Sequence, residues 1–184
     1  SRLDKDGVRR LRDEHDALVI ATGASSSVAL GVPGEDLSGV HGGLAFLAEV
    51  AAGDMEQARL SGKAVVVVGG GNVAVDCARS ALRLGASPVH MVCLEGPDEM
   101  PAYPHELAEA AEEGVQIRHG WGVRAFAGNG ELGSVGLKAC TRVFDSQGRF
   151  DPLYDEDTTE TLAAGAAVIA AGQRQDRSIL PDSL

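Results

Sequence analysis

The strongest constraint on the fold is an all-apolar run, residues 64–68, that leads directly into three consecutive glycines, residues 69–71. β-Branched residues dominate the run, and it is apolar on both faces, so it predicts a short strand buried in a parallel sheet. A helical pattern follows over residues 72–84 and ends at Gly85, and residues 89–94 predict the next strand. Strand, glycine turn, helix and strand within about 30 residues form a βαβ unit.

The glycine loop matches the pattern Gly69-x-Gly71-x-x-Ala74. Gly69 permits a tight turn out of the strand, Gly71 lets a pyrophosphate approach the backbone, and Ala74 lets the helix pack closely. The start of the helix adds unpaired N–H groups and a partial positive charge. Because the loop lies inside a βαβ unit, it predicts a dinucleotide site; a tight turn without a ligand is the alternative. The predicted binding residues are Gly69, Gly70, Gly71, Asn72, Val73 and Ala74.

Glu95 bears on the choice of dinucleotide. It follows the loop by about 20 residues, where a carboxylate accepts hydrogen bonds from a ribose 2′-OH and repels a 2′-phosphate. No Lys or Arg occurs between Arg83 and Arg118 to neutralise such a phosphate. The sequence therefore favours NAD(H) over NADP(H), with a solvated strand-end carboxylate as the alternative role for Glu95.

The rest of the chain adds short elements around this unit. Residues 17–21 form another fully apolar run and predict a buried strand of a parallel sheet, whereas residues 25–38 are typical of a linker. Turn dipeptides at 129–130 and 147–148, flanked by alternating residues, predict antiparallel hairpins. We expect an α/β fold, a Rossmann-like three-layer nucleotide-binding domain with a small antiparallel β excursion. Further helices are predicted over 44–50 and 105–113, and strands over 115–117 and 166–172.

The charge and the cysteines exclude several classes of partner and site. With 16 basic and 27 acidic residues, the net charge of −11 disfavours nucleic acid and acidic membranes. No apolar run approaches the roughly 20 residues that span a bilayer. Cys77, Cys93 and Cys140 lie far apart without a CxxC pattern, which predicts buried thiols in a reducing cytoplasm and no metal site. No catalytic side chain is predicted.

The string GKAVVVVGGGNVAVDCAR, residues 62–79, resembles the NAD(P)H-binding domain of FAD-dependent pyridine nucleotide oxidoreductases similar to the glutamate synthase small (beta) subunit. Three further segments agree with this resemblance. Residues 16–24 are similar to the strand and Thr-Gly turn that close the first half of the family's FAD domain. Residues 32–40 look like the crossover into its nucleotide domain, and residues 167–173 resemble the strand that returns to the FAD domain.

The resemblance implies a division of the chain and a chemistry. Residues 1–34 would be a stub of an FAD-binding domain plus linker, residues 35–164 the NAD(P)-binding domain, and residues 165–184 a return stub. Hydride would pass from the nicotinamide to FAD, and electrons would continue to an acceptor such as an iron–sulfur cluster. Four residues match family positions near the flavin: Thr22, Gly23, Gly172 and Gln173.

The same resemblance implies what this chain lacks. The FAD domain's own glycine loop and the cysteine-rich iron–sulfur segment are absent, so the partners would be the missing FAD domain of the same polypeptide and an iron–sulfur domain or larger subunit. We expect no bound FAD in this chain, and no turnover in isolation. NADPH-using members carry an Arg pair where this chain has Glu95-Gly96, so NADH is favoured. The alternatives are an NADPH-specific module and a non-catalytic nucleotide-binding or interaction domain.

Overall fold

A computed structural model describes residues 3–24, 26–54 and 60–181, and the other residues, Ser25 of the expected linker among them, lie outside the description. The chain divides into two units. Unit 1 combines Ser1–Ser26 with Gln173–Leu184, and unit 2 is Ser27–Gly172. Since unit 2 holds the glycine loop, the fold of that unit determines the geometry of the predicted site.

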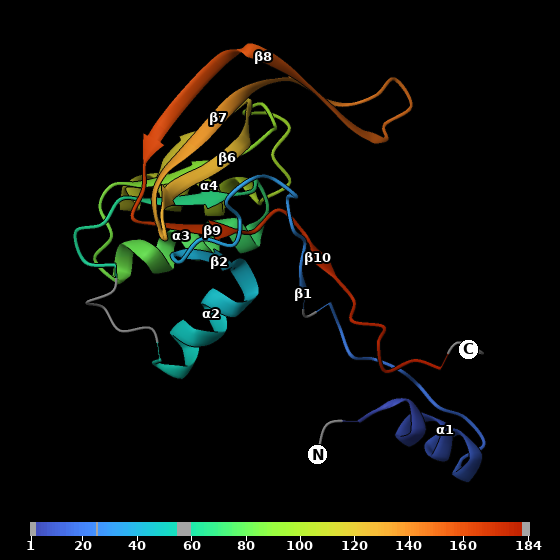
Figure 1. Ribbon diagram of the computed structural model, residues 1–184. Helices are drawn as coiled ribbons and strands as arrows, with labels where there is room; N and C mark the ends of the chain where they lie inside the picture. Colours follow the sequence, from blue (N-terminus) through green and yellow to red (C-terminus); the bar gives the residue numbers. More distant parts are fainter. Residues whose placement is uncertain (1–2, 25, 55–59, 182–184) are drawn as a thin grey trace. The chain divides into compact units, whose positions relative to one another are not determined.

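A five-stranded parallel sheet forms the centre of unit 2 (Figure 1). Every neighbouring pair of its strands runs parallel, as the apolar runs predicted. In spatial order the strands are β2 (Val40–Gly42), β9 (Ala166–Ile169), β3 (Val65–Val68), β4 (Val89–Val92) and β5 (Gln116–Arg118).

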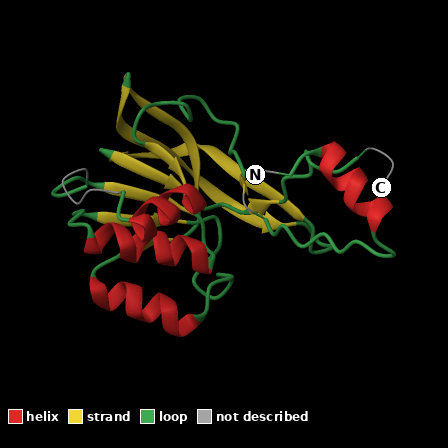
Figure 2. Ribbon diagram, turned by 90° about the horizontal axis from the view of Figure 1, so that it is seen from below, coloured by secondary structure: helices red, strands yellow, loops and turns green. Residues whose placement is uncertain are grey.

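Helices α2 (Gly43–Ala52), α3 (Asn72–Arg83) and α4 (Pro104–Glu113) cover one face of this sheet, as Figure 2 shows. Gly53 and Gly114 adopt left-handed conformations that end α2 and α4, which confirms the predicted helices and their glycine stops. The other face is covered by antiparallel strands β6 (Trp121–Asn129), β7 (Glu131–Phe144) and β8 (Phe150–Ala163). The three layers confirm the expected fold class and both hairpins.

Strand β3 contributes to the cores on both sides of the sheet. Val65 and Val67 pack with the helices, whereas Val66 and Val68 pack with the antiparallel strands. All four are at most 7% exposed. Burial of a valine side chain contributes roughly 1.5–3 kcal/mol to folding, so this strand is one of the main stabilising elements of unit 2.

Helices α3 and α4 are also joined by ion pairs on their outer surface. Arg79 of α3 lies 3.0 Å from a Glu109 carboxylate oxygen and 2.5 Å from a Glu113 carboxylate oxygen of α4. Arg83 adds a further contact of 3.1 Å to Glu113. Each of these pairs near the surface contributes little to stability, and buried residues of both helices pack in the same core.

Unit 1 differs from the prediction. Residues 17–21 do not form a strand, and Val19 is 86% exposed. The physical reason is that a strand needs hydrogen-bonding neighbours, and no described strand pairs with these residues. A helix that the sequence analysis did not predict, α1 (Lys5–Glu14), lies nearby in the chain, and its cap is the Asp4 carboxylate, which accepts a 2.8 Å hydrogen bond from the Gly7 N–H.

The strand pairing adds detail at the ends of the expected nucleotide-binding domain. Strand β9 lies between β2 and β3 in the sheet of unit 2, although the expected boundary at 164/165 placed it in the return stub. An apolar strand of this kind needs a neighbour on each edge and cover on each face, and only the sheet of unit 2 supplies both. The expected linker is partly structured too: Leu30, Val32 and Leu37 pack against the core, and β1 (Ser26–Ser27) pairs with β10 (Gln173–Arg174).

Gly69→Ala should destabilise the protein far more than Gly71→Ala. Gly69 has φ +140°, and a Cβ there would lie 2.4 Å from the Ala170 carbonyl oxygen, whereas a Cβ at Gly71 would meet nothing within 4 Å. Backbone strain and the clash together should cost about 2–4 kcal/mol at residue 69. At residue 71 the free energy of unfolding should change by no more than about 1 kcal/mol. Urea denaturation of both variants measures this difference, and equal losses would contradict it.

Candidate dinucleotide site

The glycine loop turns at the carboxyl end of β3, between the ends of β9 and β4. The Gly69 N–H donates a 2.8 Å hydrogen bond to the Val92 carbonyl. Ala170 and Ala171, which follow β9, approach Gly69 from the other side. Because the Ala170 carbonyl occupies the space of a Cβ, only glycine fits at position 69 without displacing the end of β9. The fold itself therefore requires the first glycine of the motif.

The third glycine lies in a different environment. Gly71 is the N-cap residue of α3, with φ −92° and ψ 174°, a conformation that other residues also adopt. A Cβ there would contact nothing within 4 Å. Packing among the described residues gives no reason for glycine at this position, and its absent side chain leaves open space at the start of the helix.

The start of α3 offers free hydrogen-bond donors. The N–H groups of Ala74 and Val75 both donate to the Gly71 carbonyl, at 2.9 and 3.2 Å. Among the described residues, the N–H groups of Gly71, Asn72 and Val73 have no hydrogen-bond acceptor. No acidic side chain lies in the first turn of the helix. Unpaired donors and the positive end of a helix together favour an anion.

The connection between β4 and α4 forms one rim of the loop. The Gly70 carbonyl accepts a 3.1 Å hydrogen bond from the Ala102 N–H, and the Asn72 Oδ1 accepts a 3.0 Å hydrogen bond from the Tyr103 N–H. The Asn72 side chain thus holds this rim through its Oδ1. The backbone N–H of Asn72 remains available to a ligand. Sequence reasoning missed Ala102 and Tyr103 because backbone donors leave no mark in a residue pattern.

Glu95 lies beside the loop, where its sequence spacing predicted a carboxylate. A Cβ at Gly70 would be 2.8 Å from Glu95 Oε2, so the middle glycine gives this half-buried side chain its space. The Glu95 carbonyl accepts a 3.2 Å hydrogen bond from the Gly120 N–H, which anchors the backbone at this point. Ala74 is fully buried and packs in the helix-side core with β3, so α3 lies close to the strand.

The four residues expected near a flavin are distributed over both units. Thr22, Gly23 and Gln173 belong to unit 1, and Gly172 belongs to unit 2. All four are exposed. The Gly172 carbonyl accepts a 3.1 Å hydrogen bond from the Val28 N–H, and the glycine itself has φ +127°.

The described cysteines do not provide a reactive thiolate. Burial raises the pKa of Cys77 to about 12, and the charge of Asp76 adds to this effect. Burial likewise raises the pKa of Cys93 to about 12, with a further contribution from the charge of Glu95. Cys140 is half-buried, and burial raises its pKa as well. These thiols stay protonated at neutral pH and lack nucleophilic character.

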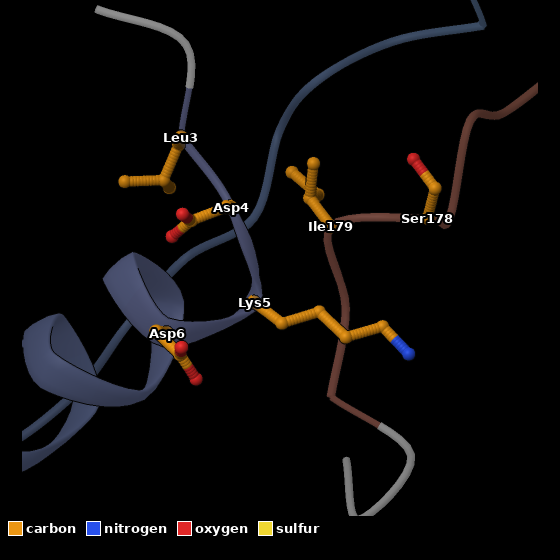
Figure 3. Close-up of a pocket in the computed structure, with 6 residues that line it drawn as sticks. All are labelled: Leu3, Asp4, Lys5, Asp6, Ser178 and Ile179. Atoms are coloured by element: carbon orange, nitrogen blue, oxygen red, sulfur yellow. The ribbon is translucent and has the colours of Figure 1, made fainter.

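Other features of the described chain offer no competing site. Within those residues, no group of His, Cys, Asp and Glu side chains is arranged to hold a metal ion, and no helix is long and apolar enough to cross a membrane. Figure 3 shows an open hollow in unit 1, lined by Leu3, Asp4, Lys5, Asp6, Ser178 and Ile179. Its Asp4 carboxylate already caps α1, and none of the predicted site residues lines it.

The layer arrangement and the glycine loop at a strand end define a Rossmann-like nucleotide-binding class of domain. The family model described as pyridine nucleotide-disulphide oxidoreductase matches residues 2–183, and the chain belongs to this family. This match confirms the resemblance to FAD-dependent pyridine nucleotide oxidoreductases that the sequence indicated.

Curated relatives are longer proteins. The chain is 40% identical over 178 residues to the NADP(+)-dependent formate dehydrogenase subunit beta of Moorella thermoacetica, covering 93% of this chain and 24% of that protein. It is 35% identical over 173 residues to the glutamate synthase [NADPH] small chain of Halomonas elongata, covering 89% of this chain and 36% of that protein. The chain thus spans about a quarter of the first relative and a little over a third of the second.

Solved structures show the same fold. FprA from Mycobacterium tuberculosis in complex with NADPH matches with a TM-score of 0.80 and 23% identity, covering 92% of this chain and 53% of that chain. Thioredoxin reductase from Giardia duodenalis matches with a TM-score of 0.62 and 29% identity, covering 91% of this chain and 47% of that chain.

Thiol modification should distinguish Cys140 from the other two cysteines. At pH 8, a thiol with a pKa of about 12 is roughly one part in 10⁴ thiolate. We expect iodoacetamide to label Cys140 first in the folded protein, and Cys77 and Cys93 only after denaturation. Peptide mass spectrometry over a time course measures the order, and labelling of Cys77 or Cys93 at the rate of Cys140 would contradict it.

Proposed function

We propose that this chain is the pyridine-nucleotide-binding module of a flavin-dependent oxidoreductase. The observation that carries the proposal is the open space at Gly71 together with the unpaired N–H groups of Gly71, Asn72 and Val73. A pyrophosphate fits this arrangement because it is anionic, needs several donors and requires close approach to the backbone. The chain needs no basic side chain for this contact, which suits its net charge of −11.

The role of the chain is to hold and orient the dinucleotide. The nicotinamide, when bound, supplies the hydride that reduces a flavin. The residues of the loop fix the pyrophosphate, and Glu95 orients the adenosine ribose by accepting hydrogen bonds from its hydroxyl groups. Within this proposal no side chain of the described residues transfers a proton or forms a covalent bond.

Glu95 supports a preference for NADH. Its carboxylate lies against the glycine loop, where it would meet the ribose 2′ position. The guanidinium group of Arg118, at the end of β5, is already paired with Glu160, so it is a poor partner for a 2′-phosphate. Like charges at short range in a half-buried site cost several-fold in affinity at the least.

An NADPH-specific module is the second candidate. The relatives in Moorella thermoacetica and Halomonas elongata are both named for NADP(H). For this candidate, the Glu95 carboxylate would have to turn away from the ribose.

The flavin and the electron acceptor would lie in the remainder of a longer protein. The two relatives are about three and about four times the length of the aligned segment, which leaves room for an FAD domain and for an acceptor domain. Thr22, Gly23, Gly172 and Gln173 are exposed and available for contact with a flavin. A larger subunit is a further partner, because two relatives are named as a subunit or small chain.

Gly71→Ala should abolish most of the dinucleotide binding without unfolding the protein. The added methyl group enters the space proposed for the pyrophosphate, so the Kd for NADH should rise at least about tenfold, which corresponds to 1.4 kcal/mol. Isothermal titration calorimetry on the 184-residue chain measures the change. The control is Gly133→Ala in β7, where a Cβ would make one ordinary contact of 3.6 Å. Unchanged binding in Gly71→Ala, or no binding of NADH or NADPH to the wild type, would overturn the proposal.

Glu95→Gln should reduce the preference for NADH over NADPH. The wild type should bind NADH at least about tenfold more tightly, and neutralising the carboxylate should remove most of that ratio. Calorimetric titration with each cofactor measures it. Glu112→Gln, an exposed residue of α4, makes the same charge change as a control. Equal or tighter NADPH binding by the wild type would instead support the NADPH-specific candidate.

A further inference from the structure

The segment that leads into α4 carries an exposed pair of aromatic rings beside the glycine loop. Tyr103 is 59% exposed, although it is one of the larger apolar side chains of the chain. Its ring stacks on the exposed His105 ring, with the centroids 5.8 Å apart and the planes 15° apart. The His105 ring therefore packs on one face of the Tyr103 ring, and the rest of the tyrosine stays largely exposed.

The backbone that carries this pair is hydrogen-bonded to the glycine loop and to the start of α3. The Tyr103 N–H donates to the Asn72 Oδ1 at the start of α3, and the preceding N–H, of Ala102, donates to the Gly70 carbonyl. Arg79 of α3 also pairs with Glu109 and Glu113 of α4, and the buried faces of the two helices share one core. The backbone of residues 102–103 is therefore fixed beside the loop, which sets where the Tyr103 side chain begins.

The position along the loop indicates which half of a dinucleotide is nearby. Glu95 and Ala102 lie at the two ends of the same connection, and both lie against Gly70. Glu95 is the residue that the proposed function assigns to the adenosine ribose. The ring attached to that ribose therefore lies on the side of the loop that Tyr103 borders.

We propose, as an extension of the proposed function, that Tyr103, supported by His105, forms an aromatic wall against which the adenine ring of the bound dinucleotide packs. Stacking on an aromatic side chain suits this ring because every base has a flat π-face, whatever its edge groups. The exposed face of Tyr103 would then become buried when the dinucleotide binds.

Removal of the ring provides the test. Tyr103→Ala should raise the Kd for NAD⁺ and for ADP-ribose equally, by roughly fivefold to a hundredfold, and Tyr103→Phe should retain most of the affinity. Calorimetric titration of the 184-residue chain with each ligand gives these values. Phe150→Ala is the matched control, because Phe150 is 65% exposed and also contacts a second aromatic ring, that of Phe144.

Each other outcome has a distinct meaning. Weaker binding of NAD⁺ with unchanged binding of ADP-ribose would overturn the assignment to adenine, since ADP-ribose lacks only the nicotinamide ring of NAD⁺. If Tyr103→Ala binds both ligands as tightly as the wild-type protein does, the aromatic wall is overturned. The proposed function would still stand in that case, because the wild-type protein would have bound ADP-ribose. Failure of the wild type to bind either ligand would overturn both proposals. Thermal denaturation of Tyr103→Ala, expected within about 0.5 kcal/mol of wild type for an exposed residue, separates loss of binding from loss of fold.

Discussion

The burial of β3 on both of its faces is the constraint on which the rest of unit 2 depends. Val65 and Val67 need the helix layer, and Val66 and Val68 need the antiparallel sheet, so neither layer alone would cover the strand. A strand that is covered on both faces and paired on both sides can change direction only beyond its own end. The chain turns there through glycine, and this places the start of α3 at the carboxyl ends of β3 and β9.

The three glycines of the loop serve different physical needs. Gly69 makes room for the end of β9, Gly70 makes room for the Glu95 carboxylate, and Gly71 leaves space that no described residue fills. Glycine therefore has a structural reason at position 69, where the obstacle is backbone, whereas at position 70 the neighbour is the end of a flexible side chain and at position 71 the reason is the proposed ligand. This division explains how one short motif can belong both to the fold and to the proposed site.

Much of the fold was predictable because its signals are local. The apolar runs, the glycine stops of α2 and α4 and the turn dipeptides each depend on a few adjacent residues, and apart from the run at residues 17–21 the structure confirms the elements that they predict. The prediction failed for residues 17–21, because an apolar run specifies a strand only where a neighbouring strand pairs with it. The sequence also did not show that β9 lies between β2 and β3, because strand order depends on pairing across the whole chain.

The sequence by itself determined the βαβ unit, the glycine loop and the spacing that brings Glu95 to its edge, since these follow from residue size, backbone freedom and periodicity. Only the tertiary structure decided which glycine is open, which N–H groups remain unpaired and where the Tyr103 ring lies. The reason is physical: these properties depend on contacts between β3, β9 and the connection into α4. Such contacts run through backbone groups, which every residue shares and no sequence pattern records.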